Sequence, residues 1–356
     1  MLQWCDNFSN YGSGLTGITN ALDGLPYAAI NTASGTQFPA DPDGVSGGRV
    51  MALAGNSNNS NLTDTRMAVP TPRKELGCGA RFWRSSLPST NGVRPVLIGF
   101  RDTANVRMYD LIVEPNGALS VYDENSVLIA TTTVPTFTPN SWQHIEMLIN
   151  STTGEFEVRR EGVSVLTGTD PSPQDKLMCI ISWTNRQNLT SNTGLGLYMK
   201  DLVVWDTTGT YNNDFMGSVA VLTMPLIADD SNTGWVPSTG TDLYPLLDET
   251  DPNDADYITA PEPAPVTALF VLEDLPADIT SVRGVQTMVR AEKSDGGDAF
   301  LQMSMESNGA FDLGTNHSVT TAMTYHWDIS EEDPNTLAQW TPGTFDDAKL
   351  RIQRTT

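Results

Sequence analysis

Two tryptophans stand next to polar side chains that could help them bind a sugar. Trp183 follows an apolar run and precedes a polar segment that contains Asn185 and Asn188, and Trp83 is followed directly by Arg84. An aromatic ring can cover the apolar face of a sugar while amide groups hydrogen-bond its hydroxyls. We keep Trp183, Asn185, Asn188 and Trp83 as candidate glycan-binding residues, although burial in a core is the interpretation that the sequence favours for each ring.

The histidines show no catalytic or metal-binding pattern. The chain has three of them, His144, His317 and His326, and none belongs to an H-E-x-x-H motif or lies beside a G-x-S-x-G nucleophile turn. His144 falls in the middle of a strand-like run, and His326 lies between two aromatic residues. We therefore expect both of these histidines to be packed or surface residues.

Strand-like runs separated by turn residues fill the first half of the chain, and long amphipathic helical patterns are absent. Short turns at residues 115–117 and 152–154 predict hairpins, so we expect an antiparallel all-β body. Alternation in residues 155–160 predicts that Phe156 and Val158 point inward. The predicted strands cover residues 4–11, 78–83, 94–101, 106–113, 118–122, 126–132, 142–149, 155–160, 163–167, 177–183 and 198–205, and residues 53–65 are predicted to be a surface loop.

The charge balance changes near residue 207, which predicts two domains. Residues 1–207 carry 14 Lys+Arg against 19 Asp+Glu, whereas residues 208–356 carry 6 against 24. We expect a first domain at 1–207, closed by the strand 198–205, and a second domain at 208–356 that begins with a strand at 218–224. After an acidic meander at 228–264, strand-like runs at 268–272, 282–292, 299–306, 322–327 and 348–353 predict a smaller β-sandwich.

The overall composition argues against nucleic acid and membranes as partners. A net charge of −23 and a pI near 4.2 disfavour binding to phosphate backbones and to anionic membrane surfaces. No apolar run approaches the roughly 18 residues of a transmembrane helix, and the N-terminus lacks the pattern of a secretion signal. We expect a soluble protein, made in the cytoplasm and without membrane insertion.

The first 206 residues or so resemble the concanavalin A-like, laminin-G-like jelly rolls. The resemblance rests on the hairpin at 116–122 (NGALSVY), the strand at 141–146 (SWQHIE) followed by 154–158 (GEFEV), and the closing strand at 199–206 (MKDLVVWD). In such folds the closing strand lies beside the N-terminal strand. The resemblance therefore implies a jelly-roll sandwich followed by a smaller C-terminal β-sandwich.

The segment after the closing strand resembles a pattern of tailed-bacteriophage virion proteins. It comprises residues 205–209 (WDTTG), 212–217 (NNDFMG), 228–232 (ADDSN) and 235–240 (WVPSTG), and the end of the chain adds 325–327 (YHW), 333–334 (DP) and 340–341 (WT). Those proteins place this pattern between a lectin-like sandwich and a C-terminal β domain. The resemblance implies a location in the virion more firmly than any one role there.

Glycanases of the concanavalin A-like fold use an E-x-D-x-x-E strand motif, because retaining hydrolysis needs two carboxyl groups about 5 Å apart. The segment 155–157 (EFE) is too short for this motif. The segment 249–254 (ETDPND) ends in Asp, contains Pro252 and lies in the acidic meander. We therefore expect that the protein is not an enzyme.

Calcium is the one cofactor that the acidic loops leave open. Lectin-like folds often hold Ca²⁺ with loop carboxylates and carbonyls, and residues 41–44 (DPDG) and 248–256 offer oxygen ligands. Neither segment completes an EF-hand, since Val45 occupies a ligand position in the first and the second lacks the glycine. We expect solvated acidic loops and no cofactor, with calcium as the weaker alternative.

The sequence thus predicts a non-enzymatic structural protein of a phage virion, assembled in the host bacterial cytoplasm. Its expected role is that of a tail or head appendage that binds host-surface glycans. The alternative is a capsid decoration or tail adaptor protein that binds only other virion proteins, for which the acidic second domain offers a surface. Symmetric self-association into a homo-oligomer is expected in either role.

Overall fold

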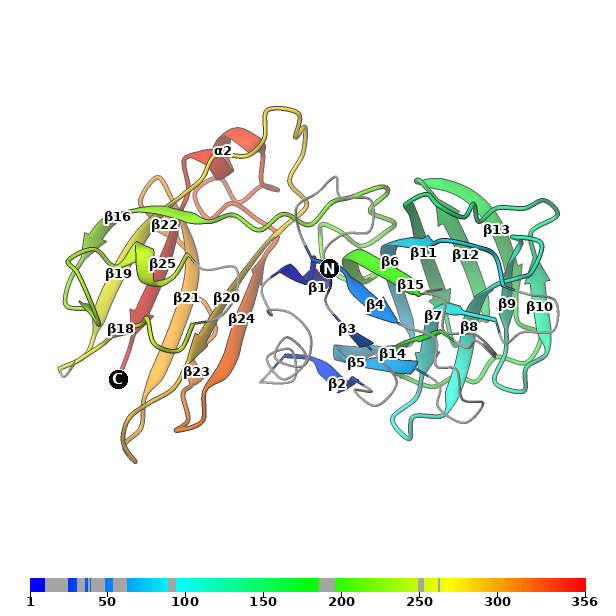
Figure 1. The fold of residues 1–356 in the computed structure, drawn as a ribbon, viewed down its shortest axis with the longest axis horizontal. Helices are drawn as coiled ribbons and strands as arrows, with labels where there is room; N and C mark the ends of the chain where they lie inside the picture. The colour runs from blue at the N-terminus through cyan, green and yellow to red at the C-terminus, as the bar shows by residue number, and fades with distance from the viewer. Residues whose placement is uncertain are drawn as a thin grey trace. The chain divides into compact units, whose positions relative to one another are not determined.

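A computed structural model describes residues 1–9, 25–30, 36–37, 39, 49–53, 63–88, 94–185, 196–248, 253–261 and 263–356. The chain forms two compact units, one of residues 1–22 and 26–221 and the other of residues 23–25 and 222–356. Both units are built from antiparallel sheets, which confirms the all-β prediction (Figure 1). Residues 208–221, which the charge pattern assigns to the second domain, belong to the first compact unit.

The first unit is a concanavalin A-like jelly-roll sandwich. Its larger sheet has the order β13-β12-β11-β6-β15-β4-β3, and β1 pairs with β15, which makes eight strands in the described part of the chain. These strands are β1 (Leu2–Asp6), β3 (Thr36–Gln37), β4 (Met51–Leu53), β6 (Glu75–Arg84), β11 (Gln143–Asn150), β12 (Glu155–Arg160), β13 (Val163–Thr169) and β15 (Leu197–Asp206).

The second sheet of this unit has the order β10-β9-β8-β7-β14-β5-β2, seven strands among the residues described. Figure 1 shows it lying across from the larger sheet. Its strands are β2 (Tyr27–Ile30), β5 (Thr63–Arg73), β7 (Val96–Arg101), β8 (Arg107–Val113), β9 (Leu119–Tyr122), β10 (Leu128–Thr131) and β14 (Met178–Asn185).

Alternating apolar residues of the two sheets form the core of the sandwich. On β12, Phe156 and Val158 are buried while Glu155 is exposed, so the predicted alternation is confirmed. The hairpins β8-β9 and β11-β12 form at the predicted turns. The pairing of β1 with β15 is the one that the jelly-roll resemblance implies.

One predicted strand does not form, and some observed strands, β5 and β16 among them, were not predicted. Residues 218–224 form no strand, and the first strand after the closing strand is β16, which begins at Leu226. Conversely, β5 has no counterpart among the predicted strands. It contains Pro70 and Pro72, which disfavour a strand prediction, and its pairing with β14 shifts register between Ala68 and Arg73, where the prolines lie.

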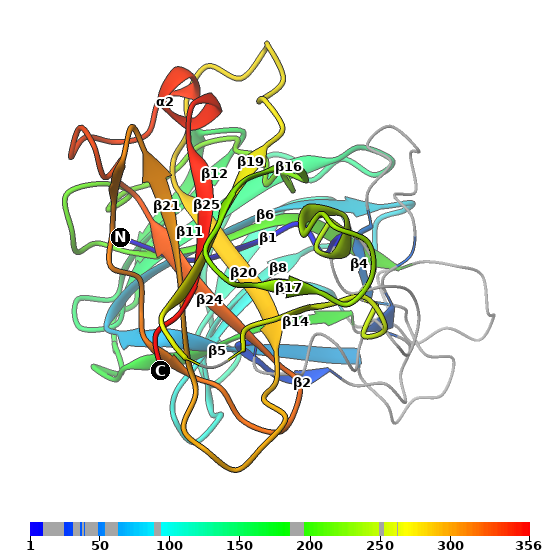
Figure 2. The ribbon, with the colours of Figure 1, turned by 90° about the vertical axis from the view of Figure 1, so that its left-hand side faces the viewer.

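The second unit contains a six-stranded sheet, again counted over described residues, with the order β16-β19-β25-β21-β22 and β23 paired to β21. Figure 2 shows β25 running between β19 and β21. The elements are β16 (Leu226–Asn232), β17 (Val236–Pro237), η3 (Tyr244–Leu246), β18 (Ile258–Thr259), β19 (Val266–Leu272), β20 (Val285–Ala291), β21 (Phe300–Ser307), β22 (Ala310–Phe311), β23 (His317–Ser318), β24 (Thr324–Ser330), α2 (Pro342–Asp346) and β25 (Lys349–Arg354).

One apolar cluster holds this second unit together. Trp235 and Trp340 are buried in it beside Phe270 of β19. The two-stranded sheet β20-β24 contributes apolar side chains of β20 to the same cluster. Helix α2 begins at a capping box in which Thr341 and Thr344 satisfy each other's backbone N–H groups.

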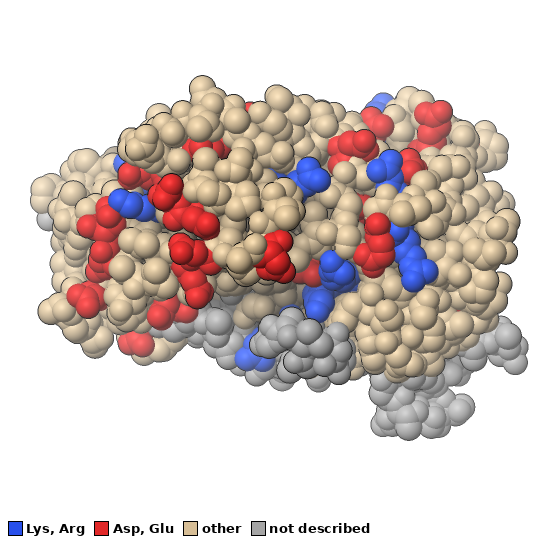
Figure 3. Space-filling view, turned by 90° about the horizontal axis from the view of Figure 1, so that it is seen from above, with Lys and Arg blue, Asp and Glu red and all other residues tan. Residues whose placement is uncertain are grey.

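The surface of the second unit is acidic. Residues 222–356 carry 6 Lys+Arg against 23 Asp+Glu. Figure 3 shows one face of the molecule, on which Asp and Glu side chains gather in groups while Lys and Arg side chains are fewer. Such a surface attracts cations and repels anionic partners.

A glycine in β6 makes room for a tryptophan of β15. A Cβ added at Gly77 would lie 2.1 Å from the Trp205 ring, and the two residues are direct cross-strand partners. The fully buried Trp205 ring therefore packs closely against the β6 backbone at Gly77.

We expect Gly77→Ala to destabilise the first unit by about 1–3 kcal/mol, because the new methyl group would displace the indole from a close-packed site. Urea unfolding followed by tryptophan fluorescence measures the change. Gly296→Ala is the control, since nothing lies within 4 Å of a Cβ at Gly296. Equal unfolding midpoints for both variants would contradict the packing argument.

Candidate functional site

Three aromatic side chains form a row across the outer face of the larger sheet. Tyr198 of β15 is the direct partner of Trp83 of β6, and their ring centroids are 5.2 Å apart at 78°. On the other side of β6, Gln143 pairs with Phe82, so Trp142 follows on as the neighbour of Trp83. All three rings are partly exposed. We call Trp142, Trp83 and Tyr198 the aromatic row.

A second row of polar side chains lies two residues further along the same strands. Lys200 pairs with Arg81, and Arg81 pairs with His144. The Lys200 ammonium lies 4.4 Å from the centroid of the Trp142 ring, which is cation–π distance. Arg81 forms an ion pair with Asp201, 3.2 Å between Nε and Oδ2. The aromatic row is thus bordered by two cations.

His144 and Glu146 follow in β11, both with fully buried side chains. The His144 Nδ1 atom lies 4.0 Å from Glu146 Oε2. Burial, with the nearby Arg81 guanidinium, lowers the pKa of His144 to about 4, so the ring is neutral at pH 7 and the two groups do not form an ion pair. Of the two expected possibilities, a packed or a surface histidine, the structure shows a packed one. Neither ring nitrogen has a hydrogen-bond partner among the residues that the structure describes.

The chain that follows the closing strand crosses this face, and Glu146 holds it there. We call residues 214–221 the strap. The Glu146 carboxylate accepts hydrogen bonds from the backbone N–H groups of Met216 (2.9 Å) and Gly217 (3.2 Å to each oxygen). Burial raises the pKa of Glu146 to about 7, although these two N–H donors act in the opposite direction.

Further contacts fix both ends of the strap. The Ser218 hydroxyl donates to Glu161 (2.7 Å) and accepts from Arg81 (2.9 Å), while the Val221 N–H donates to Asp201 (3.0 Å). At its start, the Phe215 ring packs against Trp205 with 6.0 Å between centroids, and Arg159 lies over the Phe215 ring. The strap is therefore part of the first unit and is held by side chains of β6, β11 and β15.

The four candidate glycan-binding residues do not share one site in the structure. Trp83 is in the aromatic row and stays a candidate. The Trp183 side chain is fully buried, so it packs in the core as the sequence favoured and offers no surface for a sugar. Asn185 is the last residue of β14, and Asn188 lies outside the described residues. Arg84 is buried as well, which lowers its pKa to about 10, and it does not share the exposed face of Trp83.

Sequence reasoning missed Trp142 and Tyr198 as partners of Trp83. They come from separate strands, and only the register of β11, β6 and β15 brings them together. A signal was present, because Trp142 and Tyr198 each begin a predicted strand and Trp83 ends one. In antiparallel neighbours such positions meet at the same end of the sheet.

The described residues include no group of three or more His, Cys, Asp or Glu that could hold a metal ion. Residues 41–44 and 249–252, which carry much of the calcium alternative, lie outside the described part of the chain. That alternative stays a prediction. In the same described part, none of the helices has the length and apolar character that a membrane crossing requires.

No family model matches the chain, and neither does any curated protein. Among solved structures, one named sialidase matches with a TM-score of 0.41 and 14% identity, covering 58% of this chain but 18% of its own. Cellulose induced protein Cip1 matches with a TM-score of 0.42 and 13% identity, covering 57% of this chain and 96% of its own. An alginate lyase from Corynebacterium sp. has a TM-score of 0.34 and 13% identity, covering 47% and 80%. Likeness at this level shows the fold alone.

The prediction that the protein is not an enzyme is contradicted by these comparisons. It was drawn from the lack of one glycanase motif, yet structures named as a sialidase and as alginate lyases are among the similar folds. A missing E-x-D-x-x-E motif therefore excludes one carboxylate arrangement and not catalysis on a sandwich of this kind.

From the pKa shifts of His144 and Glu146 we expect two opposite effects of pH on the stability of the first unit. The pKa of Glu146 rises from 4.5 to about 7 on folding, so its contribution is fully present below pH 4.5 and is lost as the pH rises through 7. The pKa of His144 falls from 6.5 to about 4, so its contribution is fully present above pH 6.5 and is lost as the pH falls through 4. Each pKa shift changes the free energy of unfolding by about 3 kcal/mol.

In the Glu146→Gln variant the destabilising effect of Glu146 is removed and the effect of His144 remains. We therefore expect its free energy of unfolding to rise more steeply than that of the wild type as the pH is raised from about 4 to about 6.5. Urea midpoints at several pH values measure this slope. The matched control is Glu155→Gln, which changes an exposed glutamate of β12. Parallel pH profiles for the wild type and Glu146→Gln would refute the assignment.

Proposed function

We propose that this protein binds polysaccharide through the aromatic row of its first unit. The observation that carries the proposal is the pairing of Trp83 with Tyr198 on β6 and β15, with Trp142 directly before β11 at the same end of the sheet. Partly exposed aromatic rings with polar neighbours suit a ligand that has one apolar face and a rim of hydroxyls. Arg81, Lys200 and Asp201 supply donors and acceptors beside the row.

The direction of the row sets how a ligand would lie. Neighbouring strands are roughly 4.8 Å apart, so a row over three strands spans about 10 Å across the sheet. A polysaccharide bound here would run across the strands, with successive sugar rings over successive aromatic side chains. The polar row two residues away would then contact substituents on one edge of the polymer.

For the biological setting, we propose an exposed appendage of a tailed-phage virion that binds host-surface glycans. The support is the glycan-binding surface proposed above together with the sequence resemblance, which comprises residues 205–209, 212–217, 228–232, 235–240, 325–327, 333–334 and 340–341. The partners would be other virion proteins and host polysaccharide, the protein would form a homo-oligomer, and the particle would assemble in the host cytoplasm.

The acidic second unit supports a second candidate, in which the protein decorates the capsid or joins tail components. Its 23 Asp+Glu against 6 Lys+Arg suit docking on a basic protein surface. In this role the aromatic row would contact another virion protein in place of a glycan.

We expect Trp83→Ala and Trp142→Ala each to weaken polysaccharide binding by about tenfold, because each removes one stacking surface. The measurement is isothermal titration with soluble polysaccharides that first bind the wild type on a glycan array. The matched control is Leu128→Ala, which truncates an exposed apolar side chain of β10 on the other sheet. Binding that survives both tryptophan substitutions would exclude the aromatic row.

The two virion roles differ in what an antibody against the first unit should do. If the protein is an adhesin, Fab fragments that cover the aromatic row should block adsorption of particles to host cells and leave the particles intact. The readout is the fraction of particles adsorbed, with Fab against an unrelated virion protein as the control. Normal adsorption with the Fab bound would favour the decoration or adaptor role.

A further inference from the structure

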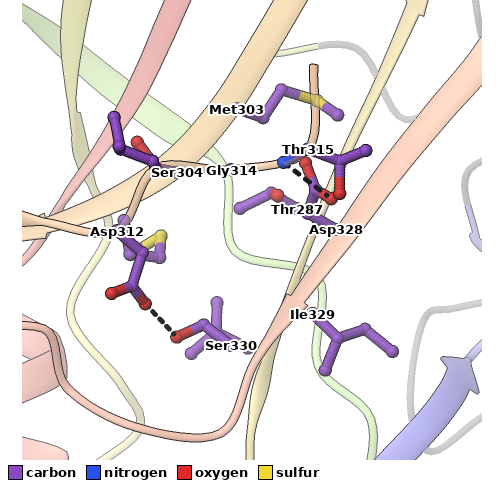
Figure 4. Close-up of a pocket in the computed structure, with 12 residues that line it drawn as sticks. Thr287, Met303, Ser304, Asp312, Gly314, Thr315, Asp328, Ile329 and Ser330 are labelled. Atoms are coloured by element: carbon purple, nitrogen blue, oxygen red, sulfur yellow. Dashed lines mark hydrogen bonds between the residues drawn. The ribbon is translucent and has the colours of Figure 1, made fainter. Parts of the chain in front are cut away.

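The polar side chains at the cleft in the second unit contact one another. The cleft has a volume of about 350 Å³ and is lined by β20, β21, β24 and residues 312–315, as Figure 4 shows. Asp328 accepts from the Thr315 N–H at 3.4 Å and lies 3.0 Å from His317 Nε2, and Asp312 accepts from the Ser330 hydroxyl at 3.4 Å. We therefore assign no ligand to this cleft.

One edge of the first unit is open to another strand. β10 and β13 are the outermost strands of their two sheets, and they lie at the same side of the sandwich (Figure 1). Among the described residues, β10 pairs only with β9 and β13 only with β12. The outer side of each strand therefore presents backbone N–H and C=O groups to which no described strand is paired. We call residues 126–138 and 162–169 the open edge.

The two stretches of the open edge run side by side. A Cβ added at Gly168 would lie 3.4 Å from the Ala130 Cβ, and further along the edge Arg160 Nη1 donates to the Thr136 carbonyl at 2.6 Å. Between these two contacts, the side chains of Val134 and Val163 are 63% and 66% exposed. The open edge is thus one continuous surface that exposes apolar side chains beside unpaired backbone.

The open edge carries no charge, although the chain as a whole is strongly acidic. Residues 126–138 and 162–169 contain no Asp, Glu, Lys or Arg, in a chain of net charge −23. Soluble proteins commonly place charged residues or proline on an edge strand, which keeps other strands away. The edge strand β16 of the second unit follows this rule with Asp229 and Asp230, whereas β13 has neither charge nor proline.

These features identify the kind of partner that fits the open edge. The unpaired backbone of β13 is satisfied best by another extended strand, as in β-strand addition. A charged partner would find no opposite charge there. Two copies of this chain repel each other over most of their acidic surface, and the open edge is a place where they can meet without like charges in contact. An antiparallel pair is also self-complementary, so β13 can pair with its own copy across a two-fold axis.

We propose that two copies of this chain associate through β13, so that the larger sheet of one copy continues into that of the other. The seven residues of β13 form a contact about 23 Å long, and Val134 and Val163 of each copy are covered beside it. This names the surface of the homo-oligomer and rests on that part of the proposed function. The aromatic row is on other strands and takes no part in the contact.

The test is sedimentation of the full chain at about 1 to about 100 µM. We expect a dimer whose affinity rises as NaCl is raised from about 0.05 to about 0.5 M, because salt screens the repulsion between the acidic copies. Val163→Lys should weaken the dimer at least about tenfold, since a lysine on an edge strand opposes pairing. Hydrogen exchange followed by mass spectrometry should show residues 163–169 more protected at the high protein concentration than at the low one.

Leu337→Lys is the matched control, because it adds the same charge at an apolar side chain of the second unit that is 70% exposed. It should dimerise as the wild type does, and thermal unfolding reports the fold of both variants. A wild-type monomer at about 100 µM, or a dimer that weakens as salt is added, would overturn the proposal. A dimer that survives Val163→Lys would also overturn it while keeping the homo-oligomer, and polysaccharide binding by a monomer would leave the glycan site standing.

Discussion

The pairing of β15 with β6 is the constraint on which the first unit depends. It places Tyr198 beside Trp83 and Lys200 beside Arg81 and, after a shift of register between Lys200 and Val203, Trp205 on Gly77, so this one pairing sets the core, the aromatic row and the polar row. A slip of one residue would turn every one of these side chains to the opposite face of the sheet. The close contact between Trp205 and Gly77 therefore helps to fix the strand register at that position in addition to packing the core.

Ionisable groups serve the two units in different ways. In the first unit, Glu146 is buried under the strap and is satisfied by backbone N–H groups, while His144 stays neutral beside it. In the second unit, Asp312 and Asp328 keep their carboxylates at a cleft that is open to solvent. The first arrangement uses a carboxylate to hold a chain segment in place, whereas in the second Asp328 accepts from the Thr315 N–H and lies 3.0 Å from His317 Nε2.

Local pattern was enough to predict most of the strands, because the apolar alternation and the short turns belong to single segments. Two features depend on distant residues and could not be predicted from local pattern. The strap has the composition of a strand, yet its backbone donors go to Glu146 and Asp201 instead of a neighbouring strand. The prolines of β5 disfavour a strand prediction, but the strand accommodates them because they lie where its pairing with β14 shifts register.

The functional surfaces were harder still to predict. Trp83 was identified from its own neighbours, but its partners Trp142 and Tyr198 are brought to it by strand pairing. Trp183 has the same local signature and is buried, since its strand β14 lies in the middle of the second sheet. The cleft in the second unit is lined by four separate segments, so no single stretch of sequence predicts it.

Two rings of the aromatic row are carried by the paired strands β6 and β15, and the third, Trp142, directly precedes β11, which has a consequence for how its ligands are held. Side chains fixed on a hydrogen-bonded sheet lose little conformational freedom when they bind, so the cost of ordering falls almost wholly on the polymer. A few stacked rings then give a weak contact that forms and breaks quickly. Lasting attachment would come from repetition, with many copies of this flat platform engaging one long polymer at once.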